Sequence, residues 1–248
     1  MHFGCMPEHL DPEQIRDYLG KLAGSEASPS RSSFKHTVYG LRFYFKLIGL
    51  RNRSIELPSI RAKYKLPTVL SKEDCKLLFK TPRLLKHRIA LCFIYSAGLR
   101  VSEFSNMKIG DVDFFRMMVH VRSGKGQKDR YVPLSKLLAS GLKKYLSAER
   151  PQKYLFEGMQ PGTPYSTRGM QWVMRETVSK AGIVKENVCV HTLRHSYATH
   201  LLEDGIDIVT IKNLLGHSNI LTTMVYLHVM QPQGKVSHSP FDTLYGKR

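Results

Sequence analysis

The chain has 248 residues, 42% of them hydrophobic, so it is long enough for two domains and cannot be wholly disordered. No uninterrupted apolar run reaches the length of a membrane-spanning helix, and none is expected. Its 38 Lys and Arg against 20 Asp and Glu leave a net charge of +18, which favours a polyanionic partner. Nucleic acid fits this charge best, with a ribosome-associated or anionic-membrane role as the alternatives.

The N-terminal region is predicted to be helical. Residues 12–22 begin with proline and place apolar side chains at helical spacing, and the pattern returns over 37–50 after a small-polar loop at 24–33. Phe43 and Phe45 are expected in the core of this region. The first ten residues lack the layout of a signal peptide and the four cysteines are scattered, so we expect a cytoplasmic protein with reduced thiols.

A basic stretch with two prolines and five Lys or Arg follows at 51–67. It can lie along a phosphate backbone as a basic strap, or serve as a solvated hinge, and the two roles are compatible. We therefore expect a helical N-terminal domain at 1–56, a basic linker at 57–67 and a second domain at 68–248.

The second domain is predicted to be mostly helical with a small β-hairpin. Ser71 is a helix N-cap with acidic residues in the following turn, and a buried helix then runs into a turn at Gly98. Val119 and Val121 alternate with polar residues, and a strand resumes near Tyr131 after a glycine-rich turn. The fold class is therefore mainly α, with a small β-hairpin or sheet.

Two motifs in this domain place charged side chains at or next to glycine turns. Arg100 follows the glycine turn and shares a helix face with Glu103, which alone indicates a surface ion pair of small value. The hairpin sequence GKGQKDR carries Lys125, Lys128 and Arg130, which would face DNA. Neither motif is specific by itself.

Three later motifs contain histidine, arginine and tyrosine. His191, Arg194 and His195 share a helix; the spacing of the two histidines suits a metal, but the arginine between them favours an anion. His217 follows Gly216, a candidate helix C′ residue, and so sits at a helix junction. Tyr226 lies nine residues further on and can reach His217 only if the chain bends between them.

Together these motifs resemble those of a known family. The phrases GLRVSE, GKGQKDR, HTLRH with ATHLLEDG, LLGH and TTMVY are similar, in this order, to signatures of the tyrosine site-specific recombinases, the phage integrase family. The likeness is strong over about residues 68–230 and is greatest to the Xer-type and transposon-borne branch. The positions that match the family's functional residues are Arg100, Lys125, His191, Arg194, His217 and Tyr226.

The resemblance implies a DNA breaking and rejoining enzyme that needs no metal and no cofactor. Its intermediate would be a covalent 3′-phosphotyrosine formed by Tyr226, with Arg100 and Arg194 holding the non-bridging oxygens. His191 would accept the tyrosine proton or hold the phosphate, and His217 would donate a further hydrogen bond.

The remaining roles follow from the same likeness. Lys125 would protonate the departing 5′-oxygen, Glu103 would orient Arg100, and Lys128 and Arg130 would support DNA binding. The partners implied are double-stranded DNA and, on paired sites, a homotetramer; no membrane is involved.

The N-terminal domain is short for the family, so a regular tetramer is in question. Two alternatives stay open: a DNA-binding protein with this fold but no productive recombination, and a relaxing activity like that of a type IB topoisomerase.

Overall fold

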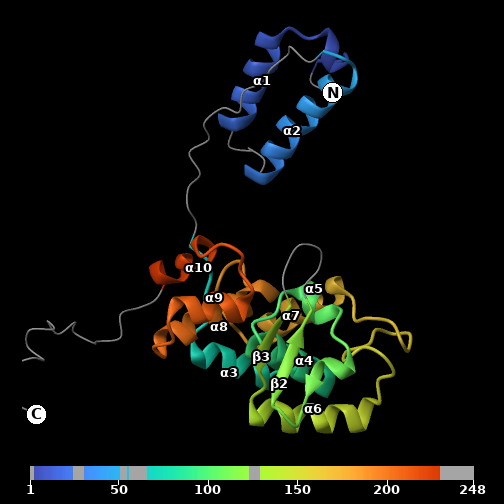
Figure 1. Ribbon diagram of the computed structural model, residues 1–248, viewed down its shortest axis with the longest axis vertical. Helices are drawn as coiled ribbons and strands as arrows, with labels where there is room; N and C mark the ends of the chain where they lie inside the picture. Colours follow the sequence, from blue (N-terminus) through green and yellow to red (C-terminus); the bar gives the residue numbers. More distant parts are fainter. Residues whose placement is uncertain (1–2, 25–30, 51–54, 56–65, 123–128, 230–248) are drawn as a thin grey trace, which may run out of the picture. The chain divides into compact units, whose positions relative to one another are not determined.

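The computed structural model describes residues 3–24, 31–50, 55, 66–122 and 129–229, with the backbone alone at 23–24 and 31–33. The chain divides into two compact units, Met1–Lys65 and Leu66–Arg248, each of which is described by itself (Figure 1). Of the linker predicted at 57–67, only Leu66 and Pro67 lie within the described residues.

The first unit is a helical pair. The 3₁₀ turn η1 (Pro7–His9) precedes α1 (Pro12–Gly24) and α2 (Arg31–Leu47), so α2 begins inside the stretch predicted as a loop. Phe45 is 1% exposed and lies in the core, as predicted, but Phe43 is 69% exposed and its prediction is wrong. Two residues apart on a helix means roughly 200° around its axis, so both rings cannot face one core. The buried side chains of this unit are Ile15, Leu19, Phe34, Val38, Phe45 and Ile55.

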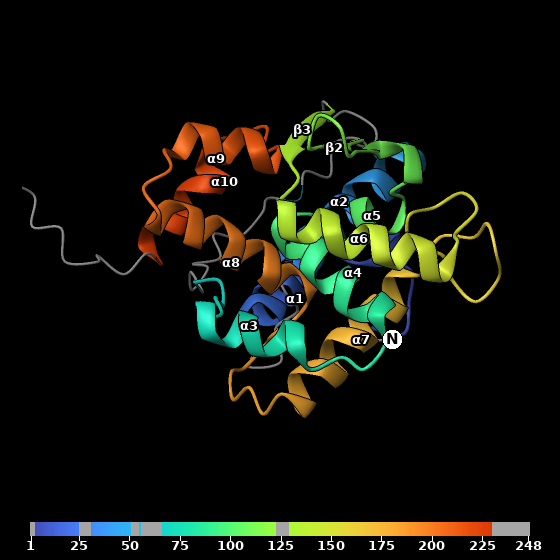
Figure 2. The same ribbon diagram turned by 90° about the horizontal axis from the view of Figure 1, so that it is seen from below.

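The second unit is built around helix α4. Its helices are α3 (Lys72–Lys80), α4 (Leu85–Ser96), α5 (Val101–Ser105), α6 (Lys136–Glu149), α7 (Thr167–Lys180), α8 (Val190–Glu203), α9 (Ile208–Leu215) and α10 (Leu221–Met224), with the 3₁₀ turns η2 (Ile109–Asp111) and η3 (Val225–His228). Helix α4 packs against α3, α6 and α8, and Figure 2 shows it between them. Ser71 caps α3 as predicted, in a reciprocal capping box with Asp74.

The predicted hairpin is present and gains a third strand. Strands β1 (Val112–Asp113), β2 (Met118–Val121) and β3 (Arg130–Pro133) form an antiparallel sheet in the order β1-β2-β3. Val119 pairs with both Val112 and Val132, and these three side chains are buried in the core. The hairpin tip at 123–128, with Lys125 and Lys128, lies outside the described residues.

Two glycines end helices at the points where functional residues follow. Gly98 has φ +56° in the turn between α4 and α5, and Gly216 has φ +64° as the C-cap of α9, a left-handed conformation that costs glycine little. Both turns were predicted. Among the described residues, no helix combines the length and apolar character needed to cross a bilayer.

Candidate active site

The turn after Gly98 places Arg100 and Glu103 together. Arg100 is the N-cap of α5, and its backbone N–H donates to Glu103 Oε2 at 2.8 Å. Its guanidinium Nη1 donates to Glu103 Oε1 at 2.8 Å. The carboxylate therefore fixes both the main chain and the side chain of Arg100, as expected from the helical spacing.

Arg130 meets the same carboxylate from the sheet. It begins β3 and lies on the inward face with Val132, 7% exposed. Its Nη1 and Nη2 donate to the two Glu103 oxygens at 2.9 and 2.8 Å, and its Nε donates to Leu214 O at 2.7 Å. The expectation that this arginine faces DNA from the hairpin therefore differs from its placement, which is buried between the sheet and α9.

Arg194 comes from α8 and ties three segments together. Its Nη1 donates to Gly98 O at 2.6 Å and its Nη2 to Leu215 O at 2.5 Å, while Nη1 lies 3.7 Å from Glu103 Oε2. Burial and the nearby Arg100 charge lower the pKa of Arg194 to about 10, so it stays cationic at neutral pH. Its guanidinium plane is set by the turn before α5 and the C-terminus of α9.

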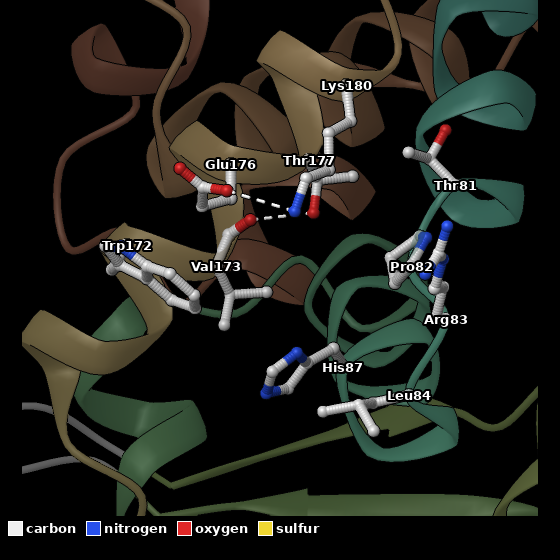
Figure 3. Close-up of a pocket in the computed structure, with 10 residues that line it drawn as sticks. All are labelled: Thr81, Pro82, Arg83, Leu84, His87, Trp172, Val173, Glu176, Thr177 and Lys180. Carbon is white, nitrogen blue, oxygen red and sulfur yellow. Dashed lines mark hydrogen bonds and ion pairs between the residues drawn. The ribbon is translucent and has the colours of Figure 1, made fainter.

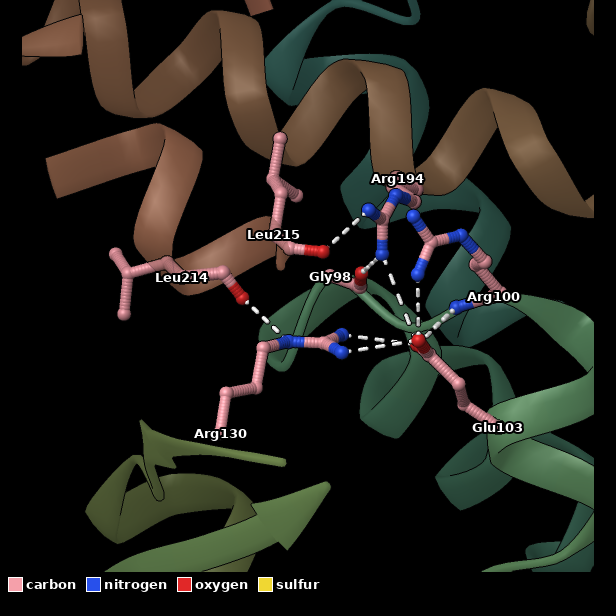
Figure 4. A network of polar contacts seen from close by, with 7 residues as sticks. All are labelled: Gly98, Arg100, Glu103, Arg130, Arg194, Leu214 and Leu215. Atoms are coloured by element: carbon pink, nitrogen blue, oxygen red, sulfur yellow. Dashed lines mark hydrogen bonds and ion pairs between the residues drawn. The ribbon is translucent and has the colours of Figure 1, made fainter. Parts of the chain in front are cut away.

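Three guanidinium groups thus converge on one carboxylate (Figure 4). Burial alone would raise the pKa of Glu103, but the hydrogen bonds and charge of Arg130, the backbone N–H of Arg100 and the charge of Arg194 lower it to about 2. The side chain of Arg100 is 25% exposed, against 6% for Arg130 and 4% for Arg194. An incoming anion therefore meets Arg100 first, with the other positive charges behind it.

His217 stands beside this cluster, directly after the C-cap of α9. Its Nδ1 lies 2.9 Å from the hydroxyl of Thr223, a fully buried residue of α10. Burial, followed by the charges of Arg194, Arg100 and Arg130, lowers the pKa of His217 to about 4. The ring is therefore neutral near pH 7, with one nitrogen held by Thr223.

Tyr226 lies in η3, on a short chain that turns back from α9 through α10. Its side chain is 3% exposed and packs with Tyr197, Ala198, Ile211 and Leu215 of α8 and α9. The hydroxyl lies 3.0 Å from His195 Nδ1. Burial raises the pKa of Tyr226, and the charges of Arg194 and Arg100 oppose that rise. The chain between His217 and Tyr226 therefore bends, and the bend brings the tyrosine hydroxyl to His195 on α8.

His191 occupies the first turn of α8 and is exposed. Although the side chain reaches solvent, neighbouring groups partly desolvate its ring, and this desolvation, with the charges of Arg194 and Arg100, lowers the pKa of His191. Of the predicted site residues, the structure gathers Arg100, Glu103, Arg130 and Arg194 into one network, with His191, His217 and Tyr226 on the elements that pack around it. Lys125 and Lys128 lie outside the described residues.

Two partners in this site were not predicted. One is the hydrogen bond between His195 of α8 and Tyr226 of η3. The other is the hydrogen bond between His217, directly after α9, and Thr223 of α10. The spacing of His195 from His191 indicated only a possible metal ligand. The position of His195 next to Arg194 does not indicate a tyrosine partner. Among the described residues, no group of three or more His, Cys, Asp or Glu side chains is arranged to hold a metal.

A separate cavity of about 600 Å³ opens between α7 and the segment that joins α3 to α4 (Figure 3). Trp172 and Val173 line one side, and Pro82, Leu84 and His87 line another. None of the predicted site residues borders it. The candidate site around Arg100 is therefore separate from this apolar cavity.

Comparisons with known proteins agree with the motifs. The model of the phage integrase family matches residues 68–232. The tyrosine recombinase XerA of Thermococcus kodakarensis is 40% identical over 205 residues, which cover 81% of this chain and 72% of that protein. A crystal structure of XerA recombinase is similar at 27% identity with a TM-score of 0.61, over 99% of this chain and 87% of that chain.

The fold also matches a recombinase solved with DNA. XerH, in a pre-cleavage complex with its difH substrate, gives a TM-score of 0.72 at 23% identity, over 89% of this chain and 68% of that chain. At this identity the match supports the fold alone. It agrees with the mainly helical fold class predicted from the sequence.

Proposed function

This chain belongs to the phage integrase family, the tyrosine recombinases, and from that premise we propose which residues perform its chemistry. As a family member it is a DNA breaking and rejoining enzyme. The observation that carries the proposal is the convergence of Arg100, Arg130 and Arg194 on Glu103, with Tyr226 packed on the helix that supplies Arg194. Segments far apart in sequence meet there.

Tyr226 is the proposed nucleophile. Its oxygen attacks the scissile phosphorus and the 5′-oxygen leaves, which conserves the phosphodiester energy in a 3′-phosphotyrosine. Negative charge on the non-bridging oxygens rises as phosphorus becomes five-coordinate. Arg100 and Arg194 would hold those oxygens, because guanidinium groups fixed by Glu103 and by backbone carbonyls need no rearrangement during the reaction.

The other predicted residues complete this scheme. His191, at the start of α8, and His217, held by Thr223, would hydrogen-bond to the phosphate. Lys125 on the hairpin would protonate the 5′-oxygen, and Lys128 would contact the DNA backbone. Arg130 supports the site from within, by fixing Glu103.

The partner is proposed to be double-stranded DNA, engaged by four copies of the chain on two sites in the cytoplasm. The net charge of +18 supports the DNA partner. We also propose residues 1–56 as a shortened DNA-binding domain, 57–67 as the basic linker and 68–248 as the catalytic domain. The separate core of the first unit supports that division.

Capture of the covalent intermediate tests the function directly. The protein is mixed with sheared total DNA of its source organism and denatured in detergent, and protein-linked fragments are precipitated and sequenced. A recurrent fragment end, joined to the protein through its 3′-phosphate, is the expected result. Fragments captured at random, or none at all, would contradict site-specific cleavage.

Two tyrosine variants assign the nucleophile in the same assay. Tyr226→Phe should abolish the adduct and leave DNA binding intact, since only the attacking oxygen is removed. Tyr197→Phe is the matched control, because Tyr197 is also a buried tyrosine of the same cluster, and its adduct should persist. An adduct retained by Tyr226→Phe would move the nucleophile to Tyr197 or to Tyr245, which lies outside the described residues.

A further inference from the structure

The nucleophile proposed above has a hydrogen-bond partner that the family likeness does not name. Tyr226 Oη lies 3.0 Å from His195 Nδ1, and the two rings pack at a centroid distance of 5.7 Å with an interplanar angle of 51°. In the part of the chain that the structure describes, no hydrogen bond joins Tyr226 to His191, the residue that the likeness suggests as its proton acceptor. The two histidines lie one turn apart on α8.

His195 is in the chemical state of a proton acceptor. Burial, then the charges of His191 and Arg194, lowers the pKa of His195 to about 4, so the ring is neutral near pH 7 and one of its nitrogens carries a lone pair. Burial raises the pKa of Tyr226, so its hydroxyl keeps its proton and is the donor in this hydrogen bond. The proton of the neutral imidazole is then on Nε2.

Substrate binding would strengthen this acceptor. The titratable and charged groups facing His195 are His191 and Arg194 on its own helix, His217 after α9, and Tyr226 in η3. A phosphodiester held by Arg194 brings a negative charge that offsets the positive charge of the guanidinium. The basicity of the imidazole therefore rises when the scissile phosphate is in place.

We propose that His195 is a catalytic residue that takes the hydroxyl proton of Tyr226 during strand cleavage. This proposal rests on the assignment of Tyr226 as nucleophile. As the bond from Tyr226 Oη to phosphorus forms, the O–H bond breaks and its proton passes to His195 Nδ1. The bond from phosphorus to the 5′-oxygen breaks, and that oxygen takes a proton from the proposed acid, Lys125. Rejoining runs the same steps backwards, with His195 returning its proton to the tyrosine oxygen.

His195→Asn separates proton transfer from positioning. The side-chain amide of Asn can place a hydrogen-bonding atom where Nδ1 lies, but it does not titrate. With a nicked duplex that carries the captured site, adduct formation by His195→Asn should slow by about 100-fold or more, with DNA affinity unchanged. The rate of the parent should rise with pH through one ionisation that His195→Asn lacks and His191→Asn keeps.

A fluorinated tyrosine at position 226 provides the rescue. Fluorine lowers the pKa of the phenol, so the nucleophile depends less on a base, and the defect of His195→Asn should shrink. Nitrogen NMR of the histidines gives a readout that needs no DNA: Nδ1 of His195 should be unprotonated, and its signal should move in Tyr226→Phe.

The outcomes separate the two proposals. No adduct with the parent protein refutes the proposed function itself. A normal adduct with the parent and an equally fast one with His195→Asn refutes only the role of His195. Loss of the ionisation in His191→Asn, or a protonated Nδ1 in the NMR spectrum, would also overturn it in favour of His191.

Discussion

The guanidinium of Arg130 binds the carboxylate of Glu103 in parallel, Nη1 to Oε1 at 2.9 Å and Nη2 to Oε2 at 2.8 Å. Both side chains are buried, with 6% and 7% of their surfaces exposed. A buried pair of this geometry is costly to break from one side, because the remaining charge loses its partner without regaining water. The pair joins β3 to α5 beneath the proposed phosphate site.

Glu103→Gln should destabilise the protein in a pH-dependent way. The folded-state pKa of Glu103 lies near 2 and its usual value is 4.5, a difference equivalent to about 3 kcal/mol. Because the folded pKa is the lower one, this stabilisation is complete above about pH 5 and disappears as the pH falls towards 2. Urea unfolding at several pH values should show the gap between parent and variant closing in acid.

Glu176→Gln is the control for this measurement. Glu176 pairs with Lys180 on the surface of α7 at 3.1 Å, so its loss should change the free energy of unfolding by less than about 1 kcal/mol. A gap for Glu103→Gln that stays constant between neutral pH and about pH 3 would contradict the lowered pKa.

Arg130→Lys should damage catalysis and spare DNA binding. Lysine keeps the charge but cannot make the fork with Glu103 and the bond to Leu214 O together, so the free energy of unfolding should fall by about 2 kcal/mol or more. A small displacement of Glu103 moves Arg100 and Arg194, and adduct formation should slow by about 100-fold.

Arg122→Lys is the matched substitution on the same hairpin, at an arginine that pairs with Asp111 and is 57% exposed. It should leave adduct formation near the parent rate. If Arg130→Lys instead weakened DNA affinity and left the rate of adduct formation on bound DNA unchanged, Arg130 would be a phosphate contact.

Gly98→Ala tests how Arg194 is aimed. A Cβ at Gly98 would lie 2.6 Å from the ring of Tyr197, and φ there is +56°. Gly205 also has a positive φ, of +88°, but open space around its Cβ position. Gly205→Ala should therefore lower the free energy of unfolding by about 1 kcal/mol and leave adduct formation unchanged. Gly98→Ala should lower the free energy of unfolding by more than this and also slow adduct formation, because Gly98 O accepts a hydrogen bond from Arg194. Equal effects of the two variants would argue against this contact.

Adduct formation should be unaffected by EDTA. In the proposed mechanism, two guanidinium groups perform the charge stabilisation that a metal ion supplies in many phosphoryl-transfer sites. The assay compares chelator with added magnesium or zinc. Activity that vanishes in EDTA and returns with metal would revive the interpretation of His191 and His195 as ligands.

A sulfur substitution tests Lys125 as the general acid. An alkoxide leaves poorly, whereas a thiolate, whose conjugate acid has a pKa of about 8.5, leaves without a proton. Lys125→Ala should be slow on the normal duplex and largely rescued when sulfur replaces the bridging 5′-oxygen. Arg194→Ala should not be rescued, because the proposed role of Arg194 is to hold the non-bridging oxygens. Equal defects of Lys125→Ala on both duplexes would leave the proton to Lys128 or a histidine.

Much of the fold could be predicted from interactions between residues close together in the sequence. The cap at Ser71, the turns at Gly98 and Gly216, and the alternation around Val119 each depend on neighbouring residues, and the structure has them as predicted. Arg130 shows what was overlooked. Arg130 lies two residues before Val132 and so on the same face of the strand. The pattern that predicts burial of Val132 therefore also predicts burial of the arginine.

The contact between His195 and Tyr226 could not be predicted in the same way. It depends on how far the chain turns back between α9 and η3, and on the packing of Ile211 and Leu215 beneath the tyrosine ring. No periodicity in the sequence encodes that turn. The three arginines around Glu103 likewise come from the N-cap of α5, from β3 and from α8, and only the assembled tertiary structure brings them together.

The burial of Tyr226 has a consequence for a protein of this charge. A chain with a net charge of +18 is expected to bind duplex DNA of any sequence through its phosphates, so most duplex that it binds has the wrong sequence. A nucleophilic tyrosine hydroxyl on the surface could cleave a strand at any of these non-specific sites. The side chain of Tyr226 is 3% exposed, so its hydroxyl is not presented to a duplex that binds the surface of this structure. With Tyr226 as the proposed nucleophile, DNA binding and strand cleavage are then separate events, and a duplex bound at the wrong sequence should stay intact.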